Sequence, residues 1–142
     1  MELNLQKTIL FLQEQEIPDN VETVAFLQKA QLEEEYHSCQ MLVLPSRKEC
    51  WGLVVNEAMA NGLPVITTEM CNAGKELIEN GINGYIVPIR DKDAIKNAVI
   101  KIGGNDDLRN QMSINNLKKI RGYTYENIVK SHIEAIGNRG EE

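Results

Sequence analysis

The sequence predicts an α/β domain built on a parallel sheet. Two short apolar runs, at 41–45 and 63–68, have the length and the composition of buried strands. A stretch with apolar residues at helical spacing follows each run, and strands that alternate with helices are typical of a parallel sheet. The chain has 142 residues, of which 42% are hydrophobic and 25% charged, as expected for one globular domain. We therefore expect a parallel sheet flanked by helices.

The first forty residues predict two helices with a strand between them. Apolar residues recur at helical spacing from Leu5 to Leu12, and a proline in the segment 17–20 ends this helix. The segment 21–27 is rich in valine and other residues that favour strands. The acidic segment 28–39 has the composition of a helix, and it leads into the first buried strand.

Beyond the first buried strand, glycine, proline and asparagine mark the ends of the elements. Gly62 and Pro64 close one helix, and two Asn-Gly turns precede a last short strand at 85–87. Asp91 stands before an amphipathic stretch, as an N-cap residue would. Together these signals place helices at 53–61, near 74–79, after Asp91, at 106–121 and at 124–136.

The charge and the cysteines exclude several classes of protein. A net charge of −6, with acids spread along the chain, argues against a nucleic-acid surface and against a polybasic membrane surface. No apolar run approaches the roughly 20 residues that span a bilayer, and the polar start of the chain is unlike a signal peptide. Three cysteines without metal-binding spacing are typical of reduced thiols, so we expect a cytoplasmic protein.

The stretch from Pro45 to Val65 places two glutamates around the start of a helix. Glu49 lies in the loop after the first buried strand, and Glu57 lies in the helix that follows. Ligands of open α/β sheets bind at the carboxyl ends of the strands, where helix N-termini offer free amides. Two acids beside an anion site suggest a ligand with both phosphates and hydroxyls, such as a sugar nucleotide.

Each glutamate also has a purely structural interpretation. Ser46 and Glu49 fit the S-x-x-E pattern of a capping box, in which Glu49 would close the start of a helix. Glu57 would then be an ordinary solvated residue of that helix. Gly52 favours a helix start beyond Glu49, which weakens the capping interpretation.

The same stretch resembles the E-x7-E segment of the family-4 (group 1) retaining glycosyltransferases, which have two Rossmann-like halves in the GT-B architecture. The matching residues are Pro45, Ser46, Glu49, Gly52, Glu57, Ala58, Met59, Ala60, Gly62, Pro64 and Val65. Trp51 replaces the family's usual aromatic residue, and Cys50 stands where proline is common. The resemblance continues more loosely from about Asn20 to Gly103. It implies that the chain is a partial Rossmann-like domain from the C-terminal half of such an enzyme.

The resemblance implies a role for each matched residue of the site. Glu49 would contact hydroxyls of the donor sugar and is the catalytic candidate, whereas Glu57 would bind the ribose diol. Trp51 would form a wall of the sugar pocket, with a half-buried wedge between loop and helix as the alternative. The backbone amides expected to face the diphosphate are those of Gly52, Leu53 and Val54.

The implied activity is that of a hexosyltransferase. The enzyme would move a sugar from a UDP- or GDP-sugar to an acceptor hydroxyl, in polysaccharide or glycolipid biosynthesis. The resemblance implies neither a cofactor nor a metal. Asp91 and Asp93 superficially resemble the D-x-D metal motif of other glycosyltransferases, but their place before a helix favours capping.

By this resemblance, the chain is a piece of a larger fold. The family's second half opens with two β-α units that nothing before Leu5 can supply, so residues 1–137 would form a truncated domain with a frayed tail at 138–142. The piece would lack the N-terminal half that completes the active-site cleft, and it would be inactive alone. Without the absent strand, we expect the segment 21–27 to pair with 41–45, and self-association through an exposed sheet edge stays open.

Two alternatives to a glycosyltransferase remain at this point. A nucleotide-sugar epimerase relative shares the two-half architecture but would need further acids and histidines. A non-catalytic nucleotide-binding α/β module, such as a receiver domain, would need an acidic cluster after its early strands, which this sequence lacks. Titration with nucleoside diphosphates would separate these classes.

Overall fold

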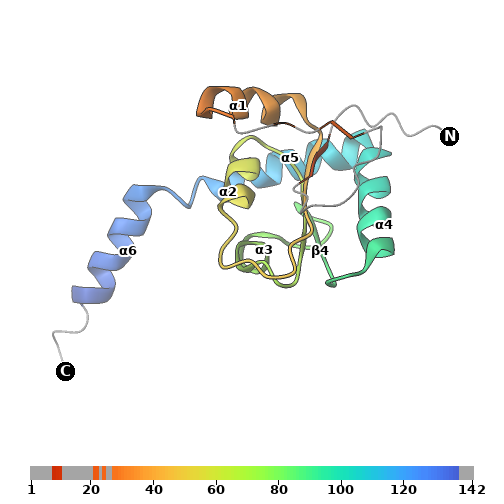
Figure 1. Cartoon of the computed structure of the whole chain (residues 1–142). Helices are drawn as coiled ribbons and strands as arrows, with labels where there is room; N and C mark the ends of the chain where they lie inside the picture. The colour runs from red at the N-terminus through yellow and green to blue at the C-terminus, as the bar shows by residue number, and fades with distance from the viewer. Residues whose placement is uncertain (1–7, 11–20, 23, 25–26, 138–142) are drawn as a thin grey trace.

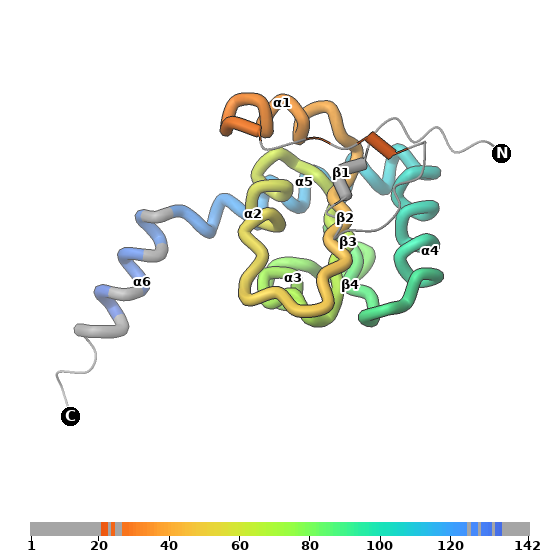
Figure 2. Tube along the Cα trace, viewed as in Figure 1, coloured from red at the N-terminus to blue at the C-terminus, as the bar shows by residue number. Residues whose placement is uncertain are grey.

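The computed structural model describes residues 8–10, 21, 22, 24 and 27–137. Over these residues, four parallel strands lie in the order β1-β2-β3-β4 and are flanked by helices (Figures 1 and 2). The strands are β1 (Thr8–Leu10), β2 (Met41–Leu44), β3 (Val65–Thr68) and β4 (Gly84–Val87). The helices are α1 (Lys29–Ser38), α2 (Leu53–Ala60), α3 (Asn72–Leu77), α4 (Lys92–Gly103), α5 (Asp106–Ile120) and α6 (Tyr125–Gly137). The predicted fold class is confirmed.

The sheet is covered on both faces, and the residues of its central strands alternate between two core clusters. Leu42 of β2 packs in a cluster with residues of α1, α2 and α3. Met41 and Val43 pack in the other cluster, with residues of α4 and α5. Figure 1 shows α2 and α3 on one side of the sheet and α4 on the other. Burial on both faces explains why β2 is apolar at every position.

The structure corrects the two elements that the sequence predicts for the start of the chain. Thr8–Leu10 forms strand β1 and is not part of a helix. The described residues of the segment 21–27, namely 21, 22, 24 and 27, lie outside any strand. β1 pairs in parallel with β2, with Ile9 opposite Leu42, so the predicted pairing of 21–27 with 41–45 is wrong.

The free edge of β2 gives the physical reason for this correction. Unpaired backbone groups beside a buried strand are costly, and a short apolar run can satisfy them as a strand even where its leucines recur at helical spacing. Two of the three residues of β1, Thr8 and Ile9, are β-branched and fit a strand. The rest of the predicted first helix and the predicted tail at 138–142 fall outside the described residues.

The later elements follow the sequence prediction closely. The Asp91 carboxylate accepts a hydrogen bond from the Ala94 amide at 2.8 Å, which confirms the predicted cap of α4. α3 begins at Asn72, earlier than the predicted start near 74, because Cys71 already accepts the first helical bond from the Lys75 amide at 3.1 Å. These helices and loops fix the ends of β2 and β3, where the candidate site lies.

α6 stands away from the sheet in both views (Figures 1 and 2). Its residues Val129 and Ile133 are 55% and 64% exposed.

In the described part of the chain, every helix is too short or too polar to cross a membrane.

Candidate functional site

Two buried threonines join the loops at the carboxyl ends of β2 and β3. The Thr67 hydroxyl donates a hydrogen bond to the Leu44 carbonyl at 3.2 Å. The Thr68 hydroxyl donates to the Ser46 carbonyl at 2.6 Å. Because both hydroxyls come from β3 and both carbonyls from the end of β2 or beyond it, the loop that leaves β2 starts in a fixed direction.

Further along, the loop after β2 is bonded to the start of α3. The Trp51 carbonyl accepts hydrogen bonds from the Ala73 amide at 2.8 Å and from the Cys71 thiol at 3.3 Å. The Asn72 side-chain amide donates to the Cys50 carbonyl at 2.7 Å. Two polar side chains and one backbone amide therefore hold two consecutive carbonyls of the loop.

Glu49 lies inside this bonded region. Its amide donates to the Met70 carbonyl at 3.2 Å, and the residue forms an isolated parallel bridge with Cys71. Its side chain is partly exposed. The capping-box interpretation does not hold, since α2 begins after Gly52 and has no side-chain cap. The carboxylate is thus attached to a fixed backbone but is not used to close a helix.

Gly52 starts α2 in a conformation and a space that require glycine. Its φ is +97°, in the left-handed region that other residues rarely adopt. A Cβ atom there would lie 2.7 Å from the Cys71 sulfur and 3.2 Å from Cγ of Glu49. The close packing of this glycine brings the loop, the start of α2 and Glu49 together.

The first turn of α2 presents open backbone amides. Val55 donates to the Gly52 carbonyl at 2.9 Å, but among the described residues the amides of Leu53 and Val54 meet no acceptor. Such amides carry the partial positive charge of a helix N-terminus, about half an elementary charge in total. This turn can therefore bind an anion.

Glu57 lies one turn into α2, on the exposed side of the helix. One of its carboxylate oxygens, Oε2, accepts a hydrogen bond from the Tyr36 hydroxyl at 2.9 Å. Tyr36 itself is only 3% exposed. Burial, followed by the hydrogen bond and the charge of Glu57, raises the pKa of Tyr36 above its ordinary value. The phenol is therefore a neutral donor at any ordinary pH.

The Trp51 side chain is hydrogen-bonded to a residue of α2. Its indole N–H donates to Oδ1 of Asn56 at 3.0 Å, and 38% of the residue is exposed. The ring is held in one orientation while part of it faces solvent. This geometry is compatible with both interpretations of Trp51, as a wall of a pocket and as a half-buried wedge.

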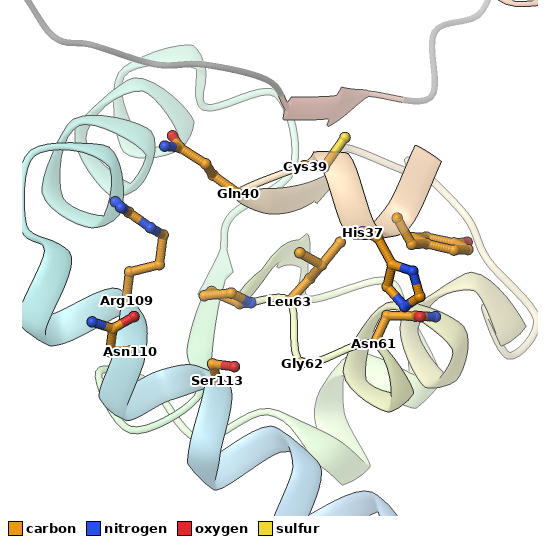
Figure 3. Close-up of a pocket in the computed structure, with 11 residues that line it drawn as sticks. His37, Cys39, Gln40, Asn61, Gly62, Leu63, Arg109, Asn110 and Ser113 are labelled. Carbon is orange, nitrogen blue, oxygen red and sulfur yellow. The ribbon is translucent and has the colours of Figure 1, made fainter. Parts of the chain in front are cut away.

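A separate hollow of about 240 Å³ lies at the opposite, amino-terminal edge of β2 and β3. Figure 3 shows side chains from α1, from the turn between α2 and β3, and from α5 around it, among them His37, Asn61 and Arg109. Arg109 is already paired with Asp106 at 2.6 Å. Two of its lining residues, Tyr36 and Asn61, form hydrogen bonds with Glu57, whereas Glu49 and Gly52 lie in the loop at the carboxyl edge.

Sequence reasoning missed the residues that hold the site in place. Tyr36 lies 21 residues before Glu57, and nothing in the local pattern links the two. The Thr68 and Asn72 side chains also donate hydrogen bonds to carbonyls that lie far away in the sequence.

Over the described residues, no group of three or more His, Cys, Asp or Glu side chains could hold a metal ion.

Comparison with known proteins gives a family match over most of the chain. Residues 3–119 match the family described as glycosyl transferases group 1. An uncharacterized glycosyltransferase of Methanocaldococcus jannaschii is 31% identical over 91 residues, which are 64% of this chain and 26% of that protein. The capsular polysaccharide biosynthesis glycosyltransferase CapM of Staphylococcus aureus is 30% identical over 103 residues, 72% of this chain and 27% of that protein.

A solved structure gives the same result for the fold. Sucrose-phosphate synthase from Thermosynechococcus elongatus superimposes with a TM-score of 0.75 at 26% identity, over 84% of this chain and 30% of that protein. The chain thus spans only about a quarter of the two sequence relatives and a comparable share of this structure. The chain belongs to the group 1 glycosyl transferases, and it forms part of the C-terminal half of their GT-B fold.

Proposed function

We propose that the chain provides the donor-binding part of a retaining glycosyltransferase, which moves a sugar from a UDP- or GDP-sugar to an acceptor hydroxyl. The observation that carries this proposal is the start of α2. There Gly52 begins a turn with open amides, and Glu49 and Glu57 stand on either side of it in the sequence. An anion site beside two carboxylates suits a ligand that has a diphosphate between two sets of hydroxyls.

The amides of Gly52, Leu53 and Val54 bind the diphosphate in this proposal. The glycine has no side chain, so phosphate oxygens can approach the backbone closely. The leaving nucleoside diphosphate gains negative charge as the glycosidic bond breaks, and fixed amides at a helix N-terminus stabilise that charge without rearranging. This stabilisation is the main catalytic contribution of this part of the enzyme.

The two carboxylates bind the two ends of the donor. Glu57 accepts hydrogen bonds from the ribose diol, which an acidic residue does in many nucleotide-binding α/β folds. Glu49 accepts hydrogen bonds from hydroxyls of the donor sugar, and the fixed backbone at this residue supports that role. Trp51 forms a wall of the sugar pocket, supported by its hydrogen bond to Asn56.

The acceptor site belongs to the other half of the enzyme in this proposal. The chain alone therefore binds the nucleotide but transfers no sugar. A hexosyl donor, a cytoplasmic location and a place in polysaccharide or glycolipid synthesis are part of the same proposal, supported by the likeness to a capsular polysaccharide enzyme. Self-association through the exposed edge of the sheet is also proposed, and light scattering at high concentration would test it.

Calorimetric titration of the chain with UDP and with GDP tests donor binding. We expect one of them to bind, and Glu57→Gln to weaken that binding by about 1.5–3 kcal/mol, the range for a hydrogen bond to a charged group. The matched control is Glu76→Gln, because Glu76 is also an exposed helical glutamate that accepts a bond from a tyrosine, Tyr123. Equal losses in both variants, or none in Glu57→Gln, would contradict the assignment.

Kinetics of an enzyme that contains both halves test the role of Glu49. We expect Glu49→Gln to lower kcat strongly while leaving the donor KM within a few-fold, because Glu49 contacts the part of the donor that reacts. A near-normal kcat in that variant would show that Glu49 has no catalytic role. Sugar transfer by the purified 142-residue chain would show that no second half is needed.

A further inference from the structure

The Tyr36 hydroxyl is a fixed point beside the proposed donor site. The residue lies near the end of α1, is 3% exposed, and packs in the core cluster that includes Leu42 and Met59. The ring also lines the hollow at the amino edge of the sheet, but its packing in this cluster restricts its rotamers. The position of its oxygen is therefore set by the packing of α1 against α2 and the sheet.

The Glu57 side chain has no such support of its own. It extends from the exposed side of α2, and a glutamate in solvent samples several rotamers. Among the described residues, the Tyr36 hydroxyl is its side-chain hydrogen-bond partner, at 2.9 Å. A ligand that binds this carboxylate must order it, and the hydrogen bond does so in advance.

The hydrogen bond also leaves the carboxylate able to bind a ligand. Tyr36 contacts Oε2, while Oε1 is not used by any described residue. A carboxylate can accept about four hydrogen bonds through its two oxygens, so two hydroxyl groups can still bind. Because the phenol keeps its proton at ordinary pH, it donates to Oε2 and places no second negative charge beside the carboxylate.

We infer that Tyr36 is a positioning residue for donor binding: its buried hydroxyl holds Oε2 of Glu57 so that the carboxylate meets the two hydroxyls of the ribose. This inference rests on the proposed role of Glu57 and adds to it a residue outside the E-x7-E segment. Tyr36 touches no part of the ligand itself. Its effect must therefore depend on the presence of the ribose hydroxyls.

The test compares a ribonucleotide with an analogue that lacks the diol. Binding of UDP and of 2′,3′-dideoxy-UDP to the chain is measured by calorimetry, and the experiment is repeated with GDP and its dideoxy analogue. Tyr36→Phe keeps the buried ring and removes only the hydroxyl. We expect the variant to bind the ribonucleotide about three- to tenfold more weakly, as for the loss of one hydrogen bond, and to bind the dideoxy analogue as before.

The control variants separate positioning from a general structural role. Tyr123→Phe removes a comparable tyrosine–glutamate bond, to Glu76 at 3.2 Å, and should change neither affinity. Equal weakening of both nucleotides in Tyr36→Phe would show a merely structural role and would overturn the inference. Unchanged affinity for both nucleotides would overturn it as well.

The same measurements distinguish failure of this inference from failure of the proposed function. If Glu57→Gln still discriminates between the ribonucleotide and the dideoxy analogue, Glu57 does not bind the ribose and the proposed function loses its support. If Glu57→Gln loses the discrimination but Tyr36→Phe retains it, the proposed function stands and the inference about Tyr36 is wrong.

A second measurement leaves the hydrogen bond in place and so does not depend on the folding of Tyr36→Phe. The chain has four tyrosines, and 3-fluorotyrosine can replace all of them. The signal of Tyr36 is assigned by elimination, with phenylalanine variants of Tyr85, Tyr123 and Tyr125. We expect its fluorine resonance to shift with the ribonucleotide and not with the dideoxy analogue. Identical responses to the two ligands would overturn the inference.

Discussion

The two edges of the sheet differ in how they are held together. At the carboxyl edge, side chains and amides from β3 and α3 bind the carbonyls of the loop after β2, and Gly52 packs against Cys71. At the amino edge, the same strands border an open hollow of about 240 Å³. The loop at the carboxyl edge is held by hydrogen bonds before any ligand binds, while at the amino edge a hollow stays open between α1, α5 and the turn after α2.

The hydrogen bonds at the carboxyl edge order the loop after β2 before a ligand binds. A loop held through the carbonyls of Ser46, Cys50 and Trp51 loses little conformational entropy when a ligand binds, so more of the binding free energy remains for affinity. Polar side chains around the hollow are bonded too, with Arg109 paired to Asp106 and Asn61 bonded to the Glu57 carbonyl, but these bonds leave the hollow itself open. Substitutions at the two edges can show whether the order at the carboxyl edge, and not the stability of the whole domain, controls nucleotide binding.

The largest effect is expected for Gly52→Ala at the carboxyl edge. The left-handed backbone costs about 1–2 kcal/mol for alanine, and the contact with the Cys71 sulfur adds an overpacking cost of about 1–3 kcal/mol. Urea denaturation measures this loss, and titration should show that nucleoside diphosphates no longer bind. The control is Gly122→Ala, whose added Cβ would lie at an ordinary 3.5 Å from the Lys119 carbonyl. If Gly52→Ala bound nucleoside diphosphates as tightly as the wild-type chain, glycine would not be required at this position.

A smaller loss is expected for Gly62→Ala at the amino edge. Gly62 has a φ of +73°, so alanine costs about 1–2 kcal/mol there as well. The Cβ would meet Oγ of Ser113 at 2.7 Å, but that hydroxyl ends a short side chain that can turn away. We expect urea denaturation to show the lower stability while nucleotide affinity stays unchanged. A parallel loss of affinity would mean that global stability, and not local order, controls binding.

Tyr36→Phe should change the stability of the chain at alkaline pH. Burial first, and then the hydrogen bond and charge of Glu57, raises the pKa of Tyr36, whereas the unfolded chain releases this proton near about pH 10. The contribution of the Tyr36 hydroxyl to the free energy of unfolding is fully present below that pH. It is lost as the pH rises above about 10, because the unfolded state then binds fewer protons than the folded state. The variant should therefore lose stability less steeply above about pH 10, by at most about 1.4 kcal/mol per pH unit. Parallel curves of unfolding free energy against pH would contradict this.

The smallest effect is expected for Asn72→Ala. It removes the 2.7 Å bond to the Cys50 carbonyl, which lies at an exposed position and can bind water instead. We expect a loss of about 0.5–1.5 kcal/mol in urea denaturation. Amide hydrogen exchange should rise in the loop at 49–52 and not in α5. Unchanged exchange in that loop would show that the Asn72 side chain does not order it.

The sequence predicts the start of α2 better than it predicts the contacts that support this region. Gly52 as the start of a helix after Glu49 follows from local patterns, and the structure confirms it with a left-handed glycine at that position. The Tyr36–Glu57 bond joins residues on two helices, and no local pattern can report such a contact. The roles of Glu49 and Glu57 toward a ligand stay predictions.

The start of the chain shows the same limit for the fold. Thr8–Leu10 becomes a strand because β2 offers it an unpaired edge, and that edge is absent from any local window of sequence. The segment 21–27 has good strand composition, but its described residues have no strand partner. By contrast, α4 has its Asp91 cap and its apolar spacing within one window, so its position could be predicted.

The three cysteines differ in exposure, which allows one of them to be labelled selectively at the carboxyl edge. Cys39 and Cys71 are buried, whereas Cys50 is exposed and directly follows Glu49. A maleimide dye should therefore react with Cys50 well before the other two thiols. The unaltered sequence thus offers a single point for a fluorescent or paramagnetic label next to the proposed sugar site. Arrival of a ligand could then be followed in real time without introducing any substitution.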